Sequence, residues 1–184
     1  MLVNAVASGV TVDVEGLFEE HHRMVFLAAY RTAGNASDAE DVLQTVFLRL
    51  LRREADAEPL NDPESYLRRA AVNAALDVMR SRQATPGVAL EDLAFTPAAN
   101  PSEGPERALE SSRIRAWLRE TVARLSPRAA EIFALRFYED MGIQGIARAL
   151  GTSEGSVAVT LSRARSRLEK EYRAYVGGKD DPRE

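Results

Sequence analysis

The sequence predicts an all-α chain built from two small helical domains that a linker joins. Ala, Leu, Arg and Glu are abundant and only 7% of the 184 residues are aromatic, a composition that favours helices over strands. No segment has the pattern of a β-hairpin, and the Asn-Gly and Asp-Gly pairs of tight hairpin turns are absent. Apolar residues recur at helical spacing on both sides of a proline-rich segment, which indicates two separate helical blocks.

The proline-rich segment sets the expected domain boundaries. Four of the eight prolines lie in residues 83–106, so this segment is predicted to be a flexible, acidic linker. We expect the first domain over residues 12–82 and the second over residues 107–176. The two ends of the chain, residues 1–11 and 177–184, are predicted to be disordered.

Three helices are predicted in the first domain. The first runs from Glu15 to Arg31 and ends at Gly34, and Ser37 is the expected N-cap of the second. The second helix buries one apolar stripe, formed by Val42, Leu43, Val46, Phe47, Leu50 and Leu51. Its polar face carries Leu48, an exposed leucine that can equally be without function.

The third helix, Glu64 to Arg82, combines an apolar face with a row of polar and basic side chains. The residues expected to point inward are Leu67, Ala71, Ala74, Ala75 and Val78. The residues expected to be available to solvent are Arg68, Arg69, Asn73, Arg80 and Arg82.

The second domain contains the strongest local pattern, a helix-turn-helix between Gly142 and Arg167. Such a motif needs a small residue where its helices cross, a glycine in the turn and an apolar anchor on the second helix. Ala147, Gly151 and Val157 have these properties at the required spacing. A generic helical hairpin is the alternative. Ahead of the motif, one helix is expected around residues 108–125, and Ser126 and Pro127 begin another that buries Ile132, Phe133, Leu135 and Phe137.

The charge is unevenly distributed along a chain whose net charge is −4. Between Asp13 and Asp41 seven acidic residues face two arginines, whereas five basic and three acidic residues lie between Glu154 and Arg173. Because phosphate neutralisation dominates DNA binding, neither domain is expected to bind DNA tightly alone. The arginine bias itself can also come from a GC-rich genome.

Several classes of site are excluded by composition. The absence of cysteine rules out disulfides and thiolate metal sites and fits a reducing cytoplasm. No apolar run approaches the roughly 20 residues of a membrane helix, and the start of the chain is a poor signal peptide. The adjacent His21 and His22 diverge on a helix and cannot bind one metal as an i,i+4 pair could. No catalytic residue, metal site or cofactor is therefore predicted.

Three segments resemble parts of one family. LSPRAAEIFALRFYEDMGIQGIARALGTSEGSVAVTLSRARSRLEKEY is similar to region four of bacterial RNA polymerase sigma factors, which reads the minus-thirty-five promoter element. LFEEHHRMVFLAAYRTAGNASDAEDVLQTVFLRLLR resembles regions 2.1 and 2.2, and SYLRRAAVNAALDVMRSR resembles regions 2.3 and 2.4. The matches cover about three quarters of the chain in the family's order. Since no room is left for regions one and three, the resemblance indicates the extracytoplasmic-function (ECF) group.

The resemblance implies partners and site residues. The partners would be core RNA polymerase, through its β′ clamp helices and β flap, promoter DNA, and an anti-sigma factor. The loop from Glu54 to Asp62 would hold a base flipped from the melted strand. Core polymerase would contact Asp38, Asp41, Gln44 and Leu48. The minus-ten element would contact Arg68, Arg69, Asn73, Arg80 and Arg82. The minus-thirty-five element would contact Ser153, Glu154, Ser156, Ala158, Thr160, Arg163, Arg165 and Arg167.

Departures from the family pattern concern readout. Ala158 and Thr160 stand where basic residues are usual, and Tyr66 stands where Trp is common. The three arginines of the last predicted helix can also form a solvated face paired with Glu169 and Glu171. The alternative function is a helix-turn-helix repressor or activator, which would account for the second domain but leave the first one and the linker without a role.

Overall fold

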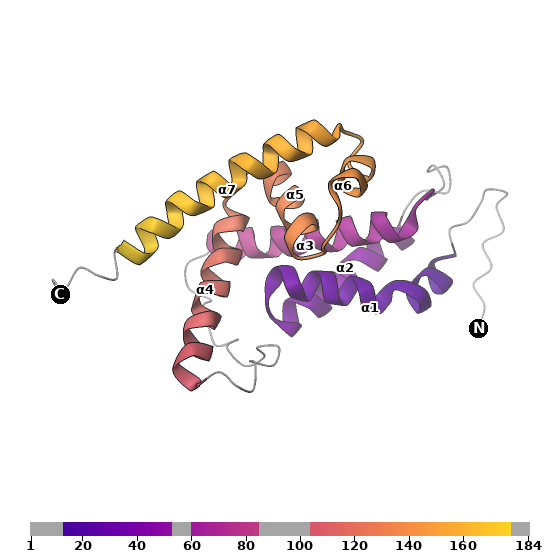
Figure 1. Ribbon diagram of the computed structural model, residues 1–184. Coiled ribbons are helices and arrows are strands. Elements are labelled where there is room, and N and C mark those ends of the chain that lie inside the picture. The colour runs from indigo at the N-terminus through magenta and orange to yellow at the C-terminus, as the bar shows by residue number, and fades with distance from the viewer. Residues whose placement is uncertain (1–12, 53–59, 85–103, 178–184) are drawn as a thin grey trace.

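The computed structural model describes residues 13–52, 60–84 and 104–177, and every regular element in these ranges is a helix. The first module consists of α1 (Val14–Ala33), α2 (Ala36–Leu51) and α3 (Pro63–Ala84). The second consists of α4 (Pro105–Ala123), α5 (Pro127–Phe137), α6 (Ile143–Ala149) and α7 (Glu154–Gly177) (Figure 1). The helices extend into both ends of the predicted linker, which otherwise lies outside the described residues.

The turn between α1 and α2 is set by two residues. Gly34 ends α1 with a φ of 89° and donates its N–H to Tyr30 O at 2.8 Å. Asn35 then caps α2: its Oδ1 accepts the Asp38 N–H at 2.8 Å, and its Nδ2 donates to Asp38 Oδ2 at 2.8 Å. The expectation that Ser37 caps α2 is wrong, because Asn35 stands at the cap position and accepts the Asp38 N–H there, while Ser37 already lies within the helix.

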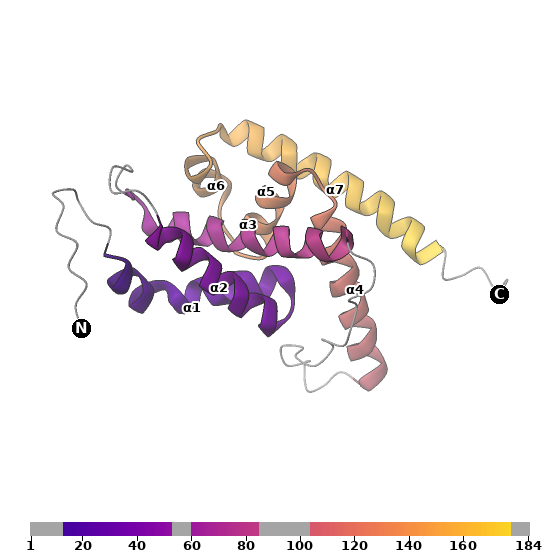
Figure 2. The ribbon, with the colours of Figure 1, turned by 180° about the vertical axis from the view of Figure 1, so that it is seen from behind.

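Helix α3 lies between the two modules and is buried on two sides (Figures 1 and 2). Towards α1 and α2 it buries the predicted apolar face, including Leu67, Ala71 and Ala75. On another side Val72 and Leu76, 0% and 1% exposed, join the core of the second module. Neither Val72 nor Leu76 was among the residues expected to point inward, because the sequence pattern was interpreted for the first domain by itself.

The helix-turn-helix forms as predicted from α6 and α7. Ala147 is buried at the crossing, Val157 is fully buried, and Gly151 occupies the turn with a φ of 58°. Ile146 and Leu161 extend the same core. Every one of these contacts is local, which is why spacing alone identified the motif.

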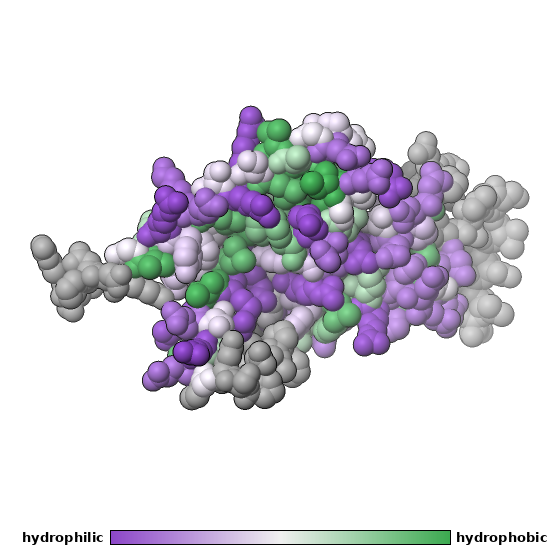
Figure 3. Space-filling model, in the orientation of Figure 1, coloured by the Kyte–Doolittle hydropathy of each residue, from purple (hydrophilic) through white to green (hydrophobic). Residues whose placement is uncertain are grey.

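Some apolar side chains remain on the surface. On the face that Figure 3 shows, apolar patches lie over α5, α6 and α7 and also towards the C-terminal end of α7. Exposed large apolar residues occur on each of the helices α1 to α7. The predicted burial of Phe137 and Leu51 is wrong, because each lies at the last position of its helix and is 39% and 63% exposed. None of the helices in the described part of the chain combines the length and the apolar character needed to cross a bilayer.

Two glycine substitutions near the turn of the helix-turn-helix should change the free energy of unfolding in opposite directions. Gly151→Ala should lower the free energy of unfolding by about 1 kcal/mol, because an L-residue at positive φ strains the backbone although no atom lies within 4 Å of its Cβ. Gly155→Ala, in the first turn of α7, should raise that free energy by up to about 1 kcal/mol. Urea unfolding of both variants measures the two effects, and equal signs would contradict this account of the turn.

Candidate nucleic-acid interface

The residues predicted to read the minus-ten element lie along α3, where the second module covers most of them. Arg68, Arg69, Asn73 and Arg80 are partly buried, and each donates a hydrogen bond to an acceptor on the second module. The expectation that these four side chains are available to solvent is therefore wrong for this arrangement. The physical reason is that the second module packs on this side of α3.

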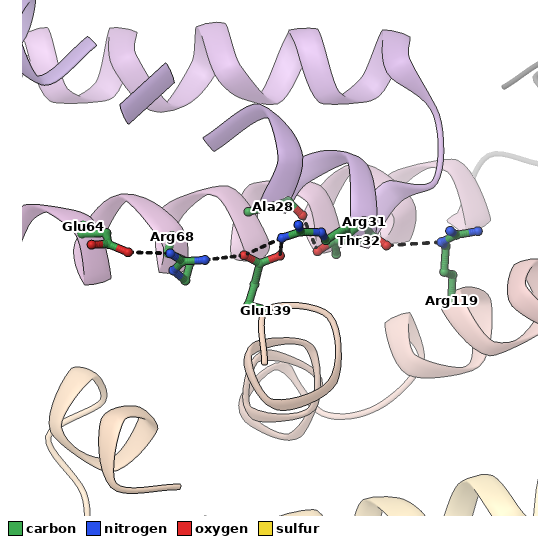
Figure 4. A network of polar contacts seen from close by, with 7 residues as sticks. All are labelled: Ala28, Arg31, Thr32, Glu64, Arg68, Arg119 and Glu139. Carbon is green, nitrogen blue, oxygen red and sulfur yellow. Dashed lines mark hydrogen bonds and ion pairs between the residues drawn. The ribbon is translucent and has the colours of Figure 1, made fainter. Parts of the chain in front are cut away.

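Glu139, in the turn between α5 and α6, is the centre of one polar network (Figure 4). Its carboxylate is fully buried and accepts hydrogen bonds from Arg68 Nη1 at 2.7 Å and from Arg31 Nη1 at 3.3 Å. Arg68 is also bound by Glu64 at 2.6 Å. Two guanidinium groups from the first module thus compensate one buried charge of the second.

Glu131, on α5, is the centre of a second network. Its Oε1 accepts Arg69 Nε at 3.1 Å and Asn73 Nδ2 at 2.9 Å, while Oε2 lies 3.4 Å from Arg128 Nη1. Only 8% of the Glu131 side chain is exposed. Arg128 belongs to the same helix, whereas Arg69 and Asn73 belong to the first module, so the donors to Oε1 depend on the contact between the modules.

Main-chain carbonyl groups complete the contact between the modules. Arg69 Nη1 donates to Ala149 O at 2.6 Å, and Arg80 Nε donates to Ala123 O at 3.1 Å. Near the C-terminal end of α4, Arg119 Nε donates to Arg31 O at 3.3 Å. Among the described residues, Arg80 Nη2 is buried without a hydrogen-bond partner, so part of its donor capacity is unused.

A buried tyrosine adjoins this contact. Burial raises the pKa of Tyr138 to about 12, an effect that the positive charge of Arg119 partly opposes. Burial is also the main reason that the pKa of Arg119 is lowered from its ordinary value. Tyr138 therefore remains neutral throughout the physiological range.

Asp38 and Arg82 form a separate pair within the first module. Arg82 Nη2 lies 2.6 Å from Asp38 Oδ1, and Asp38 is only 3% exposed. Asp38 was expected on a polymerase-binding surface, but the structure places its carboxylate beneath the start of α2, where Asn35 and Arg82 hold it. Arg82 is half exposed and thus remains accessible from one side.

The other predicted polymerase contacts do share an exposed surface on α2. Asp41 and Gln44 are exposed, and Leu48 is 48% exposed. Beside them lies a groove of about 490 Å³ between α1 and α2 with almost entirely apolar walls. Its lining residues are Val14, Glu15, Phe18, Gln44, Phe47, Leu48 and Leu51.

The predicted minus-thirty-five residues lie on α7 and the turn before it, and all of them except the partly buried Thr160 are exposed. Ser153 Oγ caps the helix by accepting the Ser156 N–H at 3.2 Å, and Thr160 Oγ1 donates to Ser156 O. Further along, the Arg165 guanidinium lies 5.0 Å from the centre of the Phe137 ring.

Arg163 and Arg167, two of the predicted DNA contacts, differ in whether another side chain pairs with them. Arg167 Nε donates to Glu171 Oε1 at 3.0 Å, and this hydrogen bond is the main reason that the pKa of Glu171 is lowered. Arg163 is exposed and forms no such pair in the described residues. Arg167 thus fits the alternative prediction, in which the arginines of this helix form a solvated face paired with glutamates.

Two further predicted features are the loop assigned to base capture and the pair of adjacent histidines. Most of the loop from Glu54 to Asp62 lies outside the described residues; its last residue, Asp62, accepts the Ser65 N–H at 3.0 Å, and hydrogen bonds from Ser65 lower the pKa of this carboxyl. His22 Nδ1 contacts Phe18 O, whereas His21 Nε2 lies 3.8 Å from Glu20. Within the described ranges no group of three His, Asp or Glu side chains is arranged to hold a metal ion.

Comparison with known families assigns both modules. Residues 17–85 match the model of sigma-70 region 2, and residues 115–168 match the model of sigma-70 region 4. The chain belongs to the sigma-70 family of RNA polymerase sigma factors. The predicted region-2 and region-4 domains are confirmed, and the region-2 match leaves the repressor alternative without support.

Individual relatives agree with the ECF group. The RNA polymerase sigma-E factor of Streptomyces coelicolor is 33% identical over 159 residues, which cover 84% of this sigma factor and 85% of that protein. The ECF RNA polymerase sigma factor SigE of Mycolicibacterium smegmatis is 33% identical over 153 residues, 83% of this chain but only 58% of that longer protein. Sigma factors are initiation factors and not enzymes, as the sequence predicted.

A solved structure shares the fold. The sigma factor RpoE of Bartonella quintana, solved together with the anti-sigma factor NepR, superposes with a TM-score of 0.53 at 20% identity. The likeness covers 86% of this sigma factor and 95% of that chain. It supports the helical architecture of the two domains.

The position of Asp38 yields a stability prediction. Asp38→Ala should lower the free energy of unfolding by about 1–3 kcal/mol, because it removes a buried partner of Asn35 and leaves Arg82 unpaired. Asp41→Ala, on the exposed face of the same helix, should change it by less than about 0.5 kcal/mol. Urea unfolding compares the two, and equal losses would contradict the structural role of Asp38.

Proposed function

We propose that this sigma factor binds core RNA polymerase through the exposed face of α2 and directs it to promoters that α3 and α7 read. The observation that carries the proposal is the presence of region 2 and region 4 on one chain in that order. A simple operator-binding protein needs only the second. Its place of action is then the cytoplasm, where RNA polymerase transcribes.

The α2 surface has the properties of a docking site for the β′ clamp helices. Leu48 and Leu51 are largely exposed beside an apolar groove, while Asp41 and Gln44 provide a polar edge. Exposed apolar side chains surrounded by polar ones are typical of protein interfaces. The family role thus gives the exposed Leu48 a reason.

The two DNA-reading helices are proposed to act as linked sites. On α3 the readers are the donors Arg68, Arg69, Asn73 and Arg80, with Arg82 beyond them; on α7 they are the exposed residues of its first half. Each helix is weakly basic, so each binds weakly alone, but fixing both on polymerase raises the effective concentration of the second site. The β flap is the proposed platform for the second module.

An anti-sigma factor is a proposed regulatory partner. The RpoE structure from Bartonella quintana contains the anti-sigma factor NepR. The same class of partner fits a chain whose two modules each present a surface that transcription requires. Co-purification from cells in which this sigma factor is inactive tests this proposal.

Run-off transcription tests the function directly. The chain, mixed with core polymerase and a pool of genomic templates, should give discrete transcripts whose start sites reveal both promoter elements. Confirmed binding to core with complete absence of transcripts would contradict the initiating role.

A substitution at Leu48 tests the α2 surface. Leu48→Asp should weaken binding to core polymerase at least about tenfold, because a charge replaces an exposed apolar side chain of the proposed interface. Leu109→Asp is the matched control, since this leucine is 49% exposed on α4. Fluorescence anisotropy with labelled sigma measures both; equal effects would contradict the assignment.

A third test concerns the recognition helix. Arg163→Ala in the holoenzyme should weaken promoter binding and lower the slope of log K against log salt by about 1, as loss of one phosphate contact does. Arg173→Ala, near the far end of α7, should leave the slope unchanged. Filter binding across a salt series measures it, and an unchanged slope for Arg163→Ala contradicts this contact.

A further inference from the structure

The apolar groove between α1 and α2 lies open beside the first turn of α1. Its walls carry Phe18, Leu48 and Leu51, which are 44%, 48% and 63% exposed. Among its lining residues, Glu15 is the one charged side chain. Large apolar side chains gathered on a surface in this way mark a binding site more often than not. The groove is therefore suited to an uncharged, apolar segment of polypeptide.

The twelve residues that precede the cap of α1, MLVNAVASGVTV, have this composition. They contain no acidic or basic side chain, and eight of them are apolar. Residues 177–184, at the other end of the chain, carry five charged side chains. Position at a chain end predicts disorder for both segments, but polypeptide that stays in water is rich in charge and poor in apolar residues. Residues 177–184 fit that description, whereas residues 1–12 favour burial against an apolar surface.

The fold delivers residues 1–12 to this groove without a connecting segment. Asp13 caps α1, its Oδ1 accepting the Gly16 N–H at 3.0 Å, and Val14 lines the groove. Val12 is therefore joined to the fold at the wall of the groove itself. A segment tethered so closely to a surface meets it at a high effective concentration, so weak apolar contacts are sufficient to hold it there.

We propose that residues 1–12 bind in the groove between α1 and α2 of their own chain and cover Phe18 and Leu48. The segment then competes with core polymerase, because both need the apolar side chain of Leu48. This competition rests on the proposed assignment of α2 to core polymerase, whereas docking of the segment does not. Polymerase binds the undocked chain and holds the segment away from the groove.

The reactivity of a thiol in the groove measures docking in the full chain. The sequence contains no cysteine, so Leu48→Cys supplies a single thiol, and the uncharged reagent N-ethylmaleimide reports its accessibility. Deletion of residues 2–12 should raise the labelling rate at least about fivefold, because only the undocked fraction reacts. Leu109→Cys is the matched control: this leucine of α4 is 49% exposed, and its variant should react equally fast with and without the segment.

Substitutions within the segment test whether apolar contacts hold it. Val3→Asp/Val6→Asp should raise the labelling rate of the Leu48→Cys chain as much as the deletion does. Asn4→Asp/Ser8→Asp adds the same two charges at polar positions and should raise that rate much less. Equal rates in the Leu48→Cys chain with and without residues 2–12, or an equal rise in the two double variants, overturn docking.

The concentration of protein distinguishes the chain's own segment from that of a second copy. Docking within one chain should give the same labelling rate at every protein concentration. A labelling rate that falls as the chain is concentrated, and does so only while residues 2–12 are present, identifies a second copy as the donor of the segment and overturns the proposal.

Affinity for core polymerase separates docking from the proposed function. With Leu48 intact, deletion of residues 2–12 should tighten binding by the same factor by which it raises the labelling rate, since both measure the undocked fraction. Fluorescence anisotropy with a dye on Leu109→Cys measures this affinity. Protection of the thiol with unchanged affinity supports docking and contradicts the assignment of α2 to core polymerase. Equal labelling rates with normal core-dependent transcription overturn docking and leave the proposed function intact.

Discussion

The arrangement of this sigma factor depends on one constraint, that α3 must satisfy neighbours on two sides. Leu67 and Ala71 complete the core of the first module, whereas Val72 and Leu76 complete that of the second. Between them, Arg68 and Arg69 provide the charge that lets Glu139 and Glu131 be buried. A buried carboxylate without such a partner is strongly unfavourable, so the two modules stabilise each other through this helix.

Phosphate groups could replace Glu131 and Glu139 as partners of the arginines on α3. Buried ion pairs contribute little net stability relative to their separated, solvated groups, because desolvation offsets most of their attraction. Phosphate oxygens offer Arg68 and Arg69 the acceptor geometry that the two glutamates offer now. Separation of the modules would also expose Val72 and Leu76, which are 0% and 1% exposed in this arrangement.

Sequence reasoning succeeded where the determining contacts are local. Ala147, Gly151 and Val157 fix the helix-turn-helix within a few turns of chain, and the apolar stripe of α2 fixes most of its buried side. The reasoning failed where the partner is distant: Arg69 and Glu131 are 62 residues apart, and no pattern joins them. One signal was present, since apolar residues surround most of α3, as in a helix buried on several sides. Asp38 was misplaced for a local reason, because Asn35 takes the cap and turns the aspartate inward.

Carboxylates of the second module balance part of the positive charge of α3. The chain as a whole carries a net charge of −4, yet α3 concentrates four arginines between Arg68 and Arg82. Such a basic row attracts any nucleic acid without regard to sequence, since phosphate contacts supply affinity but little specificity. Two glutamates of the second module, Glu139 and Glu131, form ion pairs with Arg68 and Arg69 of this row. The structure thus covers part of the basic row with the second module, whereas Asp41, Gln44 and Leu48 on α2 stay exposed.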